Sequence, residues 1–259
     1  MRRHLPIILF ALFALLYVGI TGHAGLPLFA LATTAMCTSF KQELLEGGHC
    51  FLATQLVSAT GVNAAFTLTG LASTANLAVG MAVTGTNVAA GAVIASIDGA
   101  SQVTLSKAHT GAVTTVTFTA DVFKMLLIKV SPTRTFDGTQ TNVGTPGVGS
   151  PTASNVGTDE TSGTGYTSGG SALTNVTPTT SGTTALTDFN PDPSWTSATF
   201  SATAAVIYNN STRLGAGATP LNGRAVSVHD FGGTQTVSAG TFTVILPTAD
   251  ASNAILRLA

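Results

Sequence analysis

The sequence predicts an all-β fold, an antiparallel, jelly-roll-like β-sandwich with an inserted small β domain and a short N-terminal helix. Three observations lead to this fold class. Apolar residues alternate with period two near the C-terminus, glycines divide much of the chain into short segments, and one short segment carries helical signals. We divide the chain into an apolar N-terminal segment (1–35), a β-sandwich domain (36–52 and 121–259) and the inserted domain (53–120).

Charged residues are scarce in this chain. They make up 8% of its 259 residues, whereas ordinary soluble domains have roughly 25%. The apolar fraction of 44% is sufficient for a packed core, which argues against general disorder. The net charge is −1 and the Lys and Arg residues are scattered, so the basic surface of a nucleic-acid-binding protein is missing. A surface of Thr, Ser, Asn and Gly suits a protein that is held in an assembly.

Residues 1–35 have three explanations. Arg2, Arg3 and His4 precede an uncharged apolar run, which is the pattern of a signal peptide. A membrane anchor is a second explanation, although the run is a little short for a span of about 20 residues. Because Met36 opens a segment typical of the start of a cytoplasmic protein, an extension from an upstream start codon is the third.

A short helix is expected over residues 40–46. Phe40 and Leu44 form an apolar stripe at helical spacing, and Gly47-Gly48 ends the helix after about two turns. We expect this helix to pack against an edge of the sheet.

The segment from Ala53 to Ala120 differs in kind from its surroundings, because its only Asp, Glu, Lys or Arg residues are Asp98 and Lys107. Short alternating runs separated by glycines predict a compact all-β module, with strands at Phe66–Thr69, Val79–Thr84, Val93–Ile97, Val103–Ser106 and Val113–Thr119. Without this segment, a short helix would lead directly into the apolar run 121–130, which predicts a central strand buried on both faces. The module is therefore interpreted as a domain insertion.

Residues 133–164 are rich in Gly, Thr, Ser, Pro and Asn, and such a long loop is expected to be functional or mobile. Asp159-Glu160 is an acidic pair within it. Paired carboxylates can bind calcium or act as acid and base, but adjacent acidic residues on a polar loop are expected to be solvated. Further strands are predicted at Ser171–Val176 and Thr183–Phe189.

The C-terminal region has the clearest strand patterns. Alternation of apolar and polar residues predicts four strands, at Phe200–Tyr208, Arg224–Phe231, Thr241–Pro247 and Ala254–Leu258. Gly232-Gly233 and Ala239-Gly240 are predicted to form turns between them. Strands at such short spacing predict an antiparallel sheet that forms one half of a sandwich.

Outside the insertion, the chain resembles a family of small structural proteins encoded in tailed-bacteriophage genomes. The segments that carry the resemblance cover 36–52 and 121–259 in order and include MCTSFKQELLEGGH, FKMLLIKVSP, ETSGTGYTSGGSALT and TPTTSGTTALTDF. The resemblance implies a virion component with no catalytic residues, and it supports Met36 as the usual starting point. The module at 53–120 looks like a small β module found in phage and bacterial surface proteins and departs from the usual family pattern.

The resemblance predicts a non-enzymatic virion structural protein, a capsid-decoration or head-fibre component in which the module projects outwards. A tail-associated role is the nearest variant. The expected partners are major capsid or tail proteins and further copies of this chain in a homo-oligomer, with no nucleic acid. Sparse charge is compatible with copies packed side by side, because repulsion between them is small. The expected location is the virion, or alternatively a secreted or membrane-anchored state through residues 1–35.

A carbohydrate-binding adhesin that recognises a host-surface glycan is the alternative function. Trp195, Tyr166 and Tyr208 are weak candidates for ligand contacts because aromatic rings stack on sugars, with Asp188 or Asp192 binding hydroxyl groups. Clustering of these rings on one exposed face would favour the adhesin, whereas burial would argue against it. Trp195 is interpreted first as a core residue or loop anchor.

A hydrolase would need a nucleophile, a base and an orienting acid, or two opposed carboxylates. His49, His109 and His229 are isolated in the sequence, so no catalytic residue is predicted. Cys37 and Cys50 match no common zinc-site spacing and are interpreted as buried thiols, with a disulfide between them as the alternative. We therefore expect neither a metal nor another cofactor.

Overall fold

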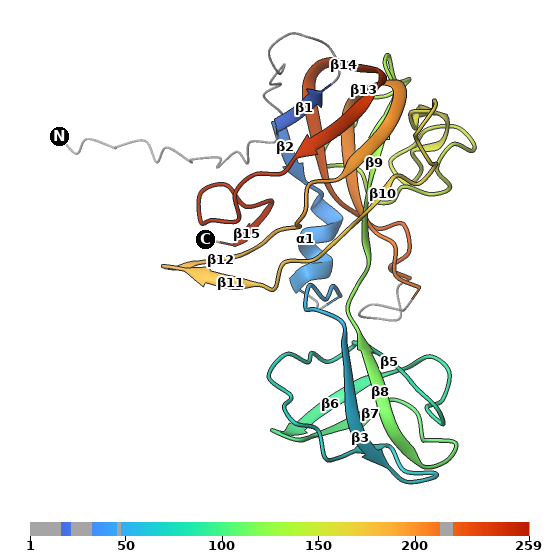
Figure 1. The fold of residues 1–259 in the computed structure, drawn as a ribbon, viewed down its shortest axis with the longest axis vertical. Helices are drawn as coiled ribbons and strands as arrows, with labels where there is room; N and C mark the ends of the chain where they lie inside the picture. Colours follow the sequence, from blue (N-terminus) through green and yellow to red (C-terminus); the bar gives the residue numbers. More distant parts are fainter. Residues whose placement is uncertain (1–16, 22–32, 46–47, 213–219, 259) are drawn as a thin grey trace, which may run out of the picture.

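The computed structural model describes residues 17–21, 33–45, 48–212 and 220–258, and it contains fifteen β-strands, one α-helix and one short 3-10 helix. The predicted all-β fold class is confirmed, since all strand pairs are antiparallel. Figure 1 shows a larger body with the helix and a smaller β body joined to it by two chain segments.

The main sheet is built around two long strands, β13 (Ser194–Asn209) and β14 (Ala225–Ile245). Its strand order is β1-β14-β13-β9-β10, with β2 also paired to β14. Strand β9 (Phe123–Ile128) pairs with β13 and with the short edge strand β10 (Ser171–Leu173). Consecutive residues from Met125 to Ile128 are fully buried, so the predicted central strand is confirmed as buried on both faces.

The predicted turns at Gly232-Gly233 and Ala239-Gly240 are wrong. Strand β14 continues through both positions, and the additional residues form bulges in its pairing with β13. Ala202 pairs with Gln235, but Ala204 pairs with Asp230, so several residues of β14 around Gly232 have no opposite partner. Because β13 is long enough to pair across the whole region, the glycines accommodate bulges rather than reversing the chain.

A second, three-stranded sheet has the order β11 (Thr179–Ser181), β12 (Thr184–Thr187) and β15 (Leu256–Leu258). This sheet lies beside helix α1 (Thr38–Leu45) (Figure 1). The bounds of α1 agree closely with those of the helix predicted for residues 40–46. Phe40 of the helix and Leu256 of β15 belong to the same hydrophobic core as the main sheet. The helix and both sheets therefore fold as one body.

Residues 53–120 form a small β-barrel. Its six strands, β3 (Gln55–Gly61), β4 (Thr67–Leu68), β5 (Ala82–Thr84), β6 (Ala92–Gly99), β7 (Gln102–Leu105) and β8 (Val113–Thr119), are arranged in the order β3-β8-β5-β6-β7-β4. A bridge between Thr60 and Thr69, with backbone bonds of 2.7 and 2.9 Å, connects the two ends of this sheet. Strand β3 was not predicted, because Ser58 and Thr60 weaken its apolar pattern.

The barrel has its own hydrophobic core, which includes Leu68, Ile94 and Phe118 and is separate from the core of the larger body. The two connecting segments meet at Cys50 and Asp121, where the Asp121 amide donates to the Cys50 carbonyl at 3.0 Å. The ends of the inserted segment are therefore adjacent, which is the geometry that domain insertion requires.

Two strands come from the N-terminal segment. Strand β1 (Tyr17–Thr21) pairs with residues 241–245 of β14, and β2 (Thr33–Met36) pairs with residues 227–230. Both add to the edge of β14 that faces away from β13. The remainder of the predicted segment 1–35 lies outside the described residues.

Candidate functional site

The acidic pair Asp159-Glu160 is buried, so the expectation that it is solvated is wrong. Asp159 is fully buried and Glu160 is 6% exposed. Burial of a charged side chain is unfavourable unless hydrogen bonds or an opposite charge compensate it. Both carboxylates meet this condition, and in doing so they hold the long loop against the main sheet.

Asp159 binds the beginning of the loop. Its Oδ2 accepts hydrogen bonds from the Thr133 amide and hydroxyl, each 2.8 Å, and its Oδ1 lies 3.0 Å from Lys129 Nζ. Burial acts to raise the pKa of this carboxyl, but the Thr133 hydrogen bonds and the Lys129 charge outweigh burial and the pKa is lowered. Asp159 is therefore a charged structural link between the end of β9 and the loop.

Glu160 organises the other part of the loop. Its Oε1 accepts from the Tyr166 hydroxyl at 2.9 Å and from the Gly169 amide at 2.6 Å, and its Oε2 accepts from the Ser168 hydroxyl at 2.6 Å. The Tyr166 oxygen in turn accepts from the Leu127 amide of β9 at 3.0 Å. These bonds attach the turn 163–170 to the central strand.

The three aromatic residues singled out from the sequence meet around this carboxylate. The Tyr166 ring is half-buried and stacks on Trp195 at a centroid distance of 6.1 Å. The Tyr208 hydroxyl donates to the Gly169 carbonyl at 2.8 Å, and the amide of the same glycine binds Glu160. Glu160 and Gly169 thus connect Tyr166 with Tyr208, and Trp195 joins them by stacking on Tyr166, a connection that their positions in the sequence do not reveal.

Two of these rings are not available for stacking on a sugar. Trp195 is 5% exposed and Tyr208 is 3% exposed, and Trp195 packs against Phe200 and Phe242 in the core. Their burial argues against an exposed three-ring platform and agrees with the interpretation of Trp195 as a core residue. Burial and the Glu160 charge raise the pKa of Tyr166 far above its usual range, and the same causes raise that of Tyr208 to about 12.

A polar cavity of about 360 Å³ opens beside Glu160. Its lining includes Glu160 and Tyr166 together with Thr158, Ser162 and Ser168. Thr158, Ser162 and Ser168 are exposed, whereas Glu160 is buried, so residues with hydroxyl groups surround a buried acidic residue. This arrangement offers hydrogen-bond donors and acceptors over an area suited to a small polar ligand.

Asp188 and Asp192, the other residues considered for sugar binding, have structural partners. Asp188 is buried and accepts from the Phe189 and Ile255 amides at 2.8 and 3.1 Å. Burial raises its pKa to about 6, although these hydrogen bonds act in the opposite direction. Asp192 accepts from the Leu246 amide at 2.9 Å. Both carboxylates therefore hold together distant parts of the chain.

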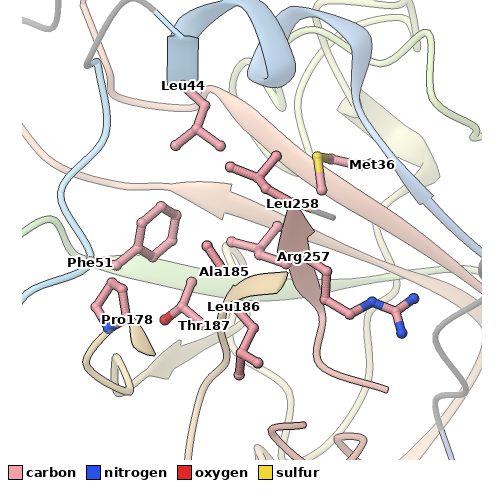
Figure 2. A pocket seen from close by; sticks show the side chains of 10 residues that line it. Met36, Leu44, Phe51, Pro178, Ala185, Leu186, Thr187, Arg257 and Leu258 are labelled. Carbon is pink, nitrogen blue, oxygen red and sulfur yellow. The ribbon is translucent and has the colours of Figure 1, made fainter. Parts of the chain in front are cut away.

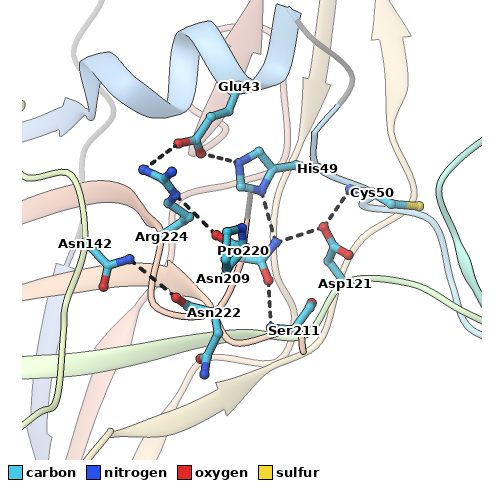
Figure 3. Close-up of polar contacts among 10 residues, drawn as sticks. All are labelled: Glu43, His49, Cys50, Asp121, Asn142, Asn209, Ser211, Pro220, Asn222 and Arg224. Carbon is cyan, nitrogen blue, oxygen red and sulfur yellow. Dashed lines mark hydrogen bonds and ion pairs between the residues drawn. The ribbon is translucent and has the colours of Figure 1, made fainter. Parts of the chain in front are cut away.

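A second polar cluster lies where the barrel joins the larger body (Figure 3). The Asn209 amide nitrogen donates to His49 Nδ1 at 3.0 Å and to Asp121 Oδ2 at 2.8 Å. His49 Nε2 lies 2.8 Å from a Glu43 oxygen, and the other Glu43 oxygen is 3.2 Å from Arg224. These contacts assign the tautomer of His49 with the proton on Nε2. We interpret the cluster as the structural support of the junction.

Among the described residues, the other two histidines, His109 and His229, are also held by neighbouring groups. His229 is fully buried and lies 2.9 Å from the Ser227 hydroxyl. His109 Nε2 lies 3.0 Å from the Thr67 carbonyl inside the barrel. Burial lowers the pKa of His229 to about 3, which keeps it neutral at physiological pH. Cys37 and Cys50 are buried thiols rather than halves of a disulfide, as expected.

An apolar pocket of about 120 Å³ lies between α1 and the three-stranded sheet (Figure 2). Met36 and Leu44 line one side, whereas Leu186 and Leu258 line the other. Leu258 is 53% exposed, so apolar surface extends from the pocket to the outside of β15. The lining has little capacity to bind a polar ligand.

Among the described residues, no group of three or more His, Cys, Asp or Glu side chains is arranged to hold a metal ion. In the same parts of the chain, no helix combines the length and apolar character that a membrane crossing requires. Comparisons with protein-family models, curated proteins and solved structures give no match to this chain.

Sequence reasoning missed the role of Glu160 and of Asn209. Glu160 was noted only as half of an acidic pair, and its partners Tyr166, Ser168 and Gly169 follow within nine positions. This short spacing is a signal that could have indicated a self-contained loop. Asn209 and His49 are 160 positions apart, and no local pattern connects them.

Proposed function

We propose that this chain is a non-enzymatic structural protein of a tailed-bacteriophage virion. In this proposal it is a head-decoration or head-fibre component that acts through contacts with neighbouring subunits. The observation that carries the proposal is the ordered resemblance over 36–52 and 121–259 to a family of phage structural proteins. The segments that carry it contribute to a single hydrophobic core, while 53–120 has another, which is compatible with a virion domain that acquired a module.

Surface chemistry supports a role in an assembly. With 8% charged residues, copies of this chain can lie side by side with little electrostatic repulsion. The three-stranded sheet has short outer strands, β11 and β15, whose backbone groups offer a route to pairing between subunits. Capsid or tail proteins and further copies of the chain are the proposed partners.

The barrel is suited to projecting from such an assembly. Its strands pair around a nearly closed sheet, so few backbone groups remain for edge-to-edge pairing. Its only Asp, Glu, Lys and Arg side chains are tied to the barrel itself, because Asp98 accepts from Ser96 and Thr104 and Lys107 donates to the Ala90 carbonyl. We therefore propose that the barrel makes contacts through side chains and loops.

Labelling of intact virions tests the proposal. Virions produced from a genome that encodes this chain are incubated with a gold-labelled antibody raised against residues 53–120 and imaged by negative-stain electron microscopy. We expect regularly spaced label on the capsid. Particles from a genome in which 53–120 has been removed provide the control, and they should bind no antibody.

Other labelling patterns have defined meanings. Label confined to the tail would overturn the decoration role and indicate a part used in adsorption. Absence of label and of the chain's peptides from purified particles, with the protein present in the infected cells, would overturn the assignment to the virion.

A further inference from the structure

A purely architectural role does not explain the polar cavity beside Glu160. We propose that it binds a neutral carbohydrate, with Glu160 accepting hydrogen bonds from sugar hydroxyls and Tyr166 contacting the sugar ring. This inference goes beyond the proposed structural role and does not depend on where the chain lies in a particle. In this proposal Trp195 and Tyr208 do not contact the ligand. Trp195 supports the Tyr166 ring, and Tyr208 holds the turn at Gly169.

The Glu160 carboxylate has room for a further hydrogen bond. A carboxylate offers about four acceptor positions, and three donors from the protein bind Glu160, two on Oε1 and one on Oε2. Gly147 lies next to Oε2, where a Cβ atom would stand 3.5 Å from both Oε2 and the Ser168 hydroxyl. Glycine at position 147 therefore leaves space beside Glu160 Oε2, the oxygen that accepts only one hydrogen bond from the described residues.

The charge of the cavity selects among ligand classes. No Lys or Arg occurs among the described residues that line it, so an anion would meet only the negative Glu160. Of the nearby cations, Lys129 is paired with Asp159, and Lys124, whose ammonium lies close to Gly169, does not belong to the lining. Calcium takes six to eight oxygen ligands, commonly with several carboxylates, whereas the lining described here supplies one. A neutral ligand with several hydroxyl groups matches the carboxylate and the surrounding Ser and Thr side chains best.

The aromatic side of the cavity is held in a fixed position. The Tyr166 ring is backed by Trp195 at 6.1 Å and by Phe200 at 5.6 Å, and its hydroxyl is bound at both Leu127 and Glu160. A rigid ring loses little conformational entropy when a ligand packs on it. Sugars have apolar C–H faces as well as hydroxyl groups, so a fixed ring beside a carboxylate complements both parts.

Trp195 makes the test direct, because it is the only tryptophan in the chain and it stacks on Tyr166. The full chain is titrated with methyl glucoside, methyl galactoside, methyl mannoside and N-acetylglucosamine while its tryptophan fluorescence is recorded. We expect at least one of these probes to change the fluorescence in a saturable manner, with a Kd on the order of 1 mM or lower. Failure of all four to bind overturns the proposal.

Three variants locate the binding. Ser162 lines the cavity and is exposed, so Ser162→Phe should block the cavity without disturbing the fold and weaken binding at least about tenfold. Ser154→Phe places the same side chain at an exposed position of the same loop outside the cavity, and it should bind like the wild type. Glu160→Gln removes the charge and should also weaken binding about tenfold.

Melting curves of the variants accompany the titrations, so that loss of fold is separated from loss of binding. Equal binding by the wild type and Ser162→Phe would place the sugar elsewhere and overturn the proposal. A fluorescence change that calcium chloride alone produces, and that Ser162→Phe abolishes, would assign the cavity to a cation and overturn it as well.

Discussion

His229 and Asp188 are buried titratable residues whose pKa values are shifted in directions that give opposite pH dependences. Burial lowers the pKa of His229 to about 3 from 6.5, and burial raises that of Asp188 to about 6 from 3.8. Between pH 3 and 6.5 the unfolded chain holds more protons at the histidine, so this residue reduces stability as the pH falls. Between pH 3.8 and 6 the folded chain holds more protons at Asp188, so this residue increases stability as the pH falls.

The two effects oppose one another from about pH 6 to about pH 4, and Asp188→Asn removes one of them. We expect the free energy of unfolding of this variant to fall with decreasing pH more steeply than that of the wild type, by up to about 1.4 kcal/mol per pH unit. Urea unfolding at pH 6.5, 5.5 and 4.5 measures the slope.

Asp192→Asn is a second test, because the nearby Asp192 charge also raises the pKa of Asp188. Its slope should lie between that of the wild type and that of Asp188→Asn. An Asp188→Asn slope equal to the wild-type slope would show that Asp188 does not hold a raised pKa in the folded state.

At the scale of elements, the turn that follows Glu160 depends on close approach to the central strand. Gly170 has a φ of +73°, and a Cβ atom at this position would overlap the Met125 carbonyl of β9. Gly182, in the hairpin between β11 and β12, has a similar φ of +60° with no atom near its Cβ position. The two positions share the backbone conformation and differ in packing.

Alanine substitution at the two glycines separates these contributions. Gly182→Ala should lower the free energy of unfolding by about 1 kcal/mol, the typical strain of a left-handed residue. Gly170→Ala should cost about 1–3 kcal/mol more because the strand or the turn must move. Chemical denaturation with urea measures both variants, and equal losses would mean that the turn does not approach β9 closely.

At the scale of the whole molecule, two separate cores are joined at Cys50 and Asp121. The Cys50 amide donates to Asp121 Oδ2 at 2.9 Å, and Asn209 donates to the same oxygen at 2.8 Å. Val122 and Ser211 add a further link, an amide-to-hydroxyl bond of 2.9 Å. These hydrogen bonds tie the junction to the end of β13 and to the segment that follows it.

Removal of the barrel should leave the larger body folded. We expect a chain in which a two-glycine turn replaces residues 53–119 to keep a cooperative thermal transition, because the hydrophobic core of the main sheet is retained. Circular dichroism melts of this chain and of the full chain provide the measurement. A deletion chain that is unfolded at 25 °C, with the full chain folded, would show that the two cores depend on one another.

Local patterns were sufficient for much of the fold. Alternating apolar residues identified β13 and most barrel strands, because the side chains of a strand face opposite sides at every second position. A continuous apolar run identified β9, which is buried on both faces. The same reasoning failed at Gly232, where a bulge and a turn require similar backbone freedom and differ only in what lies opposite. Strand β3 and the exposed strand β11 have too little apolar contrast to be recognised from sequence.

The sequence by itself determined the all-β class, the short helix and the scarcity of charge, since these follow from composition and from neighbours along the chain. Only the tertiary structure decided that Glu160 is buried, that Tyr166 lies between Glu160 and Trp195, and that Asn209 joins His49 to Asp121. The physical reason is that burial and hydrogen bonding of a polar group depend on residues far away in the sequence. Their positions are fixed only when the strands pair and the loops pack on the sheet.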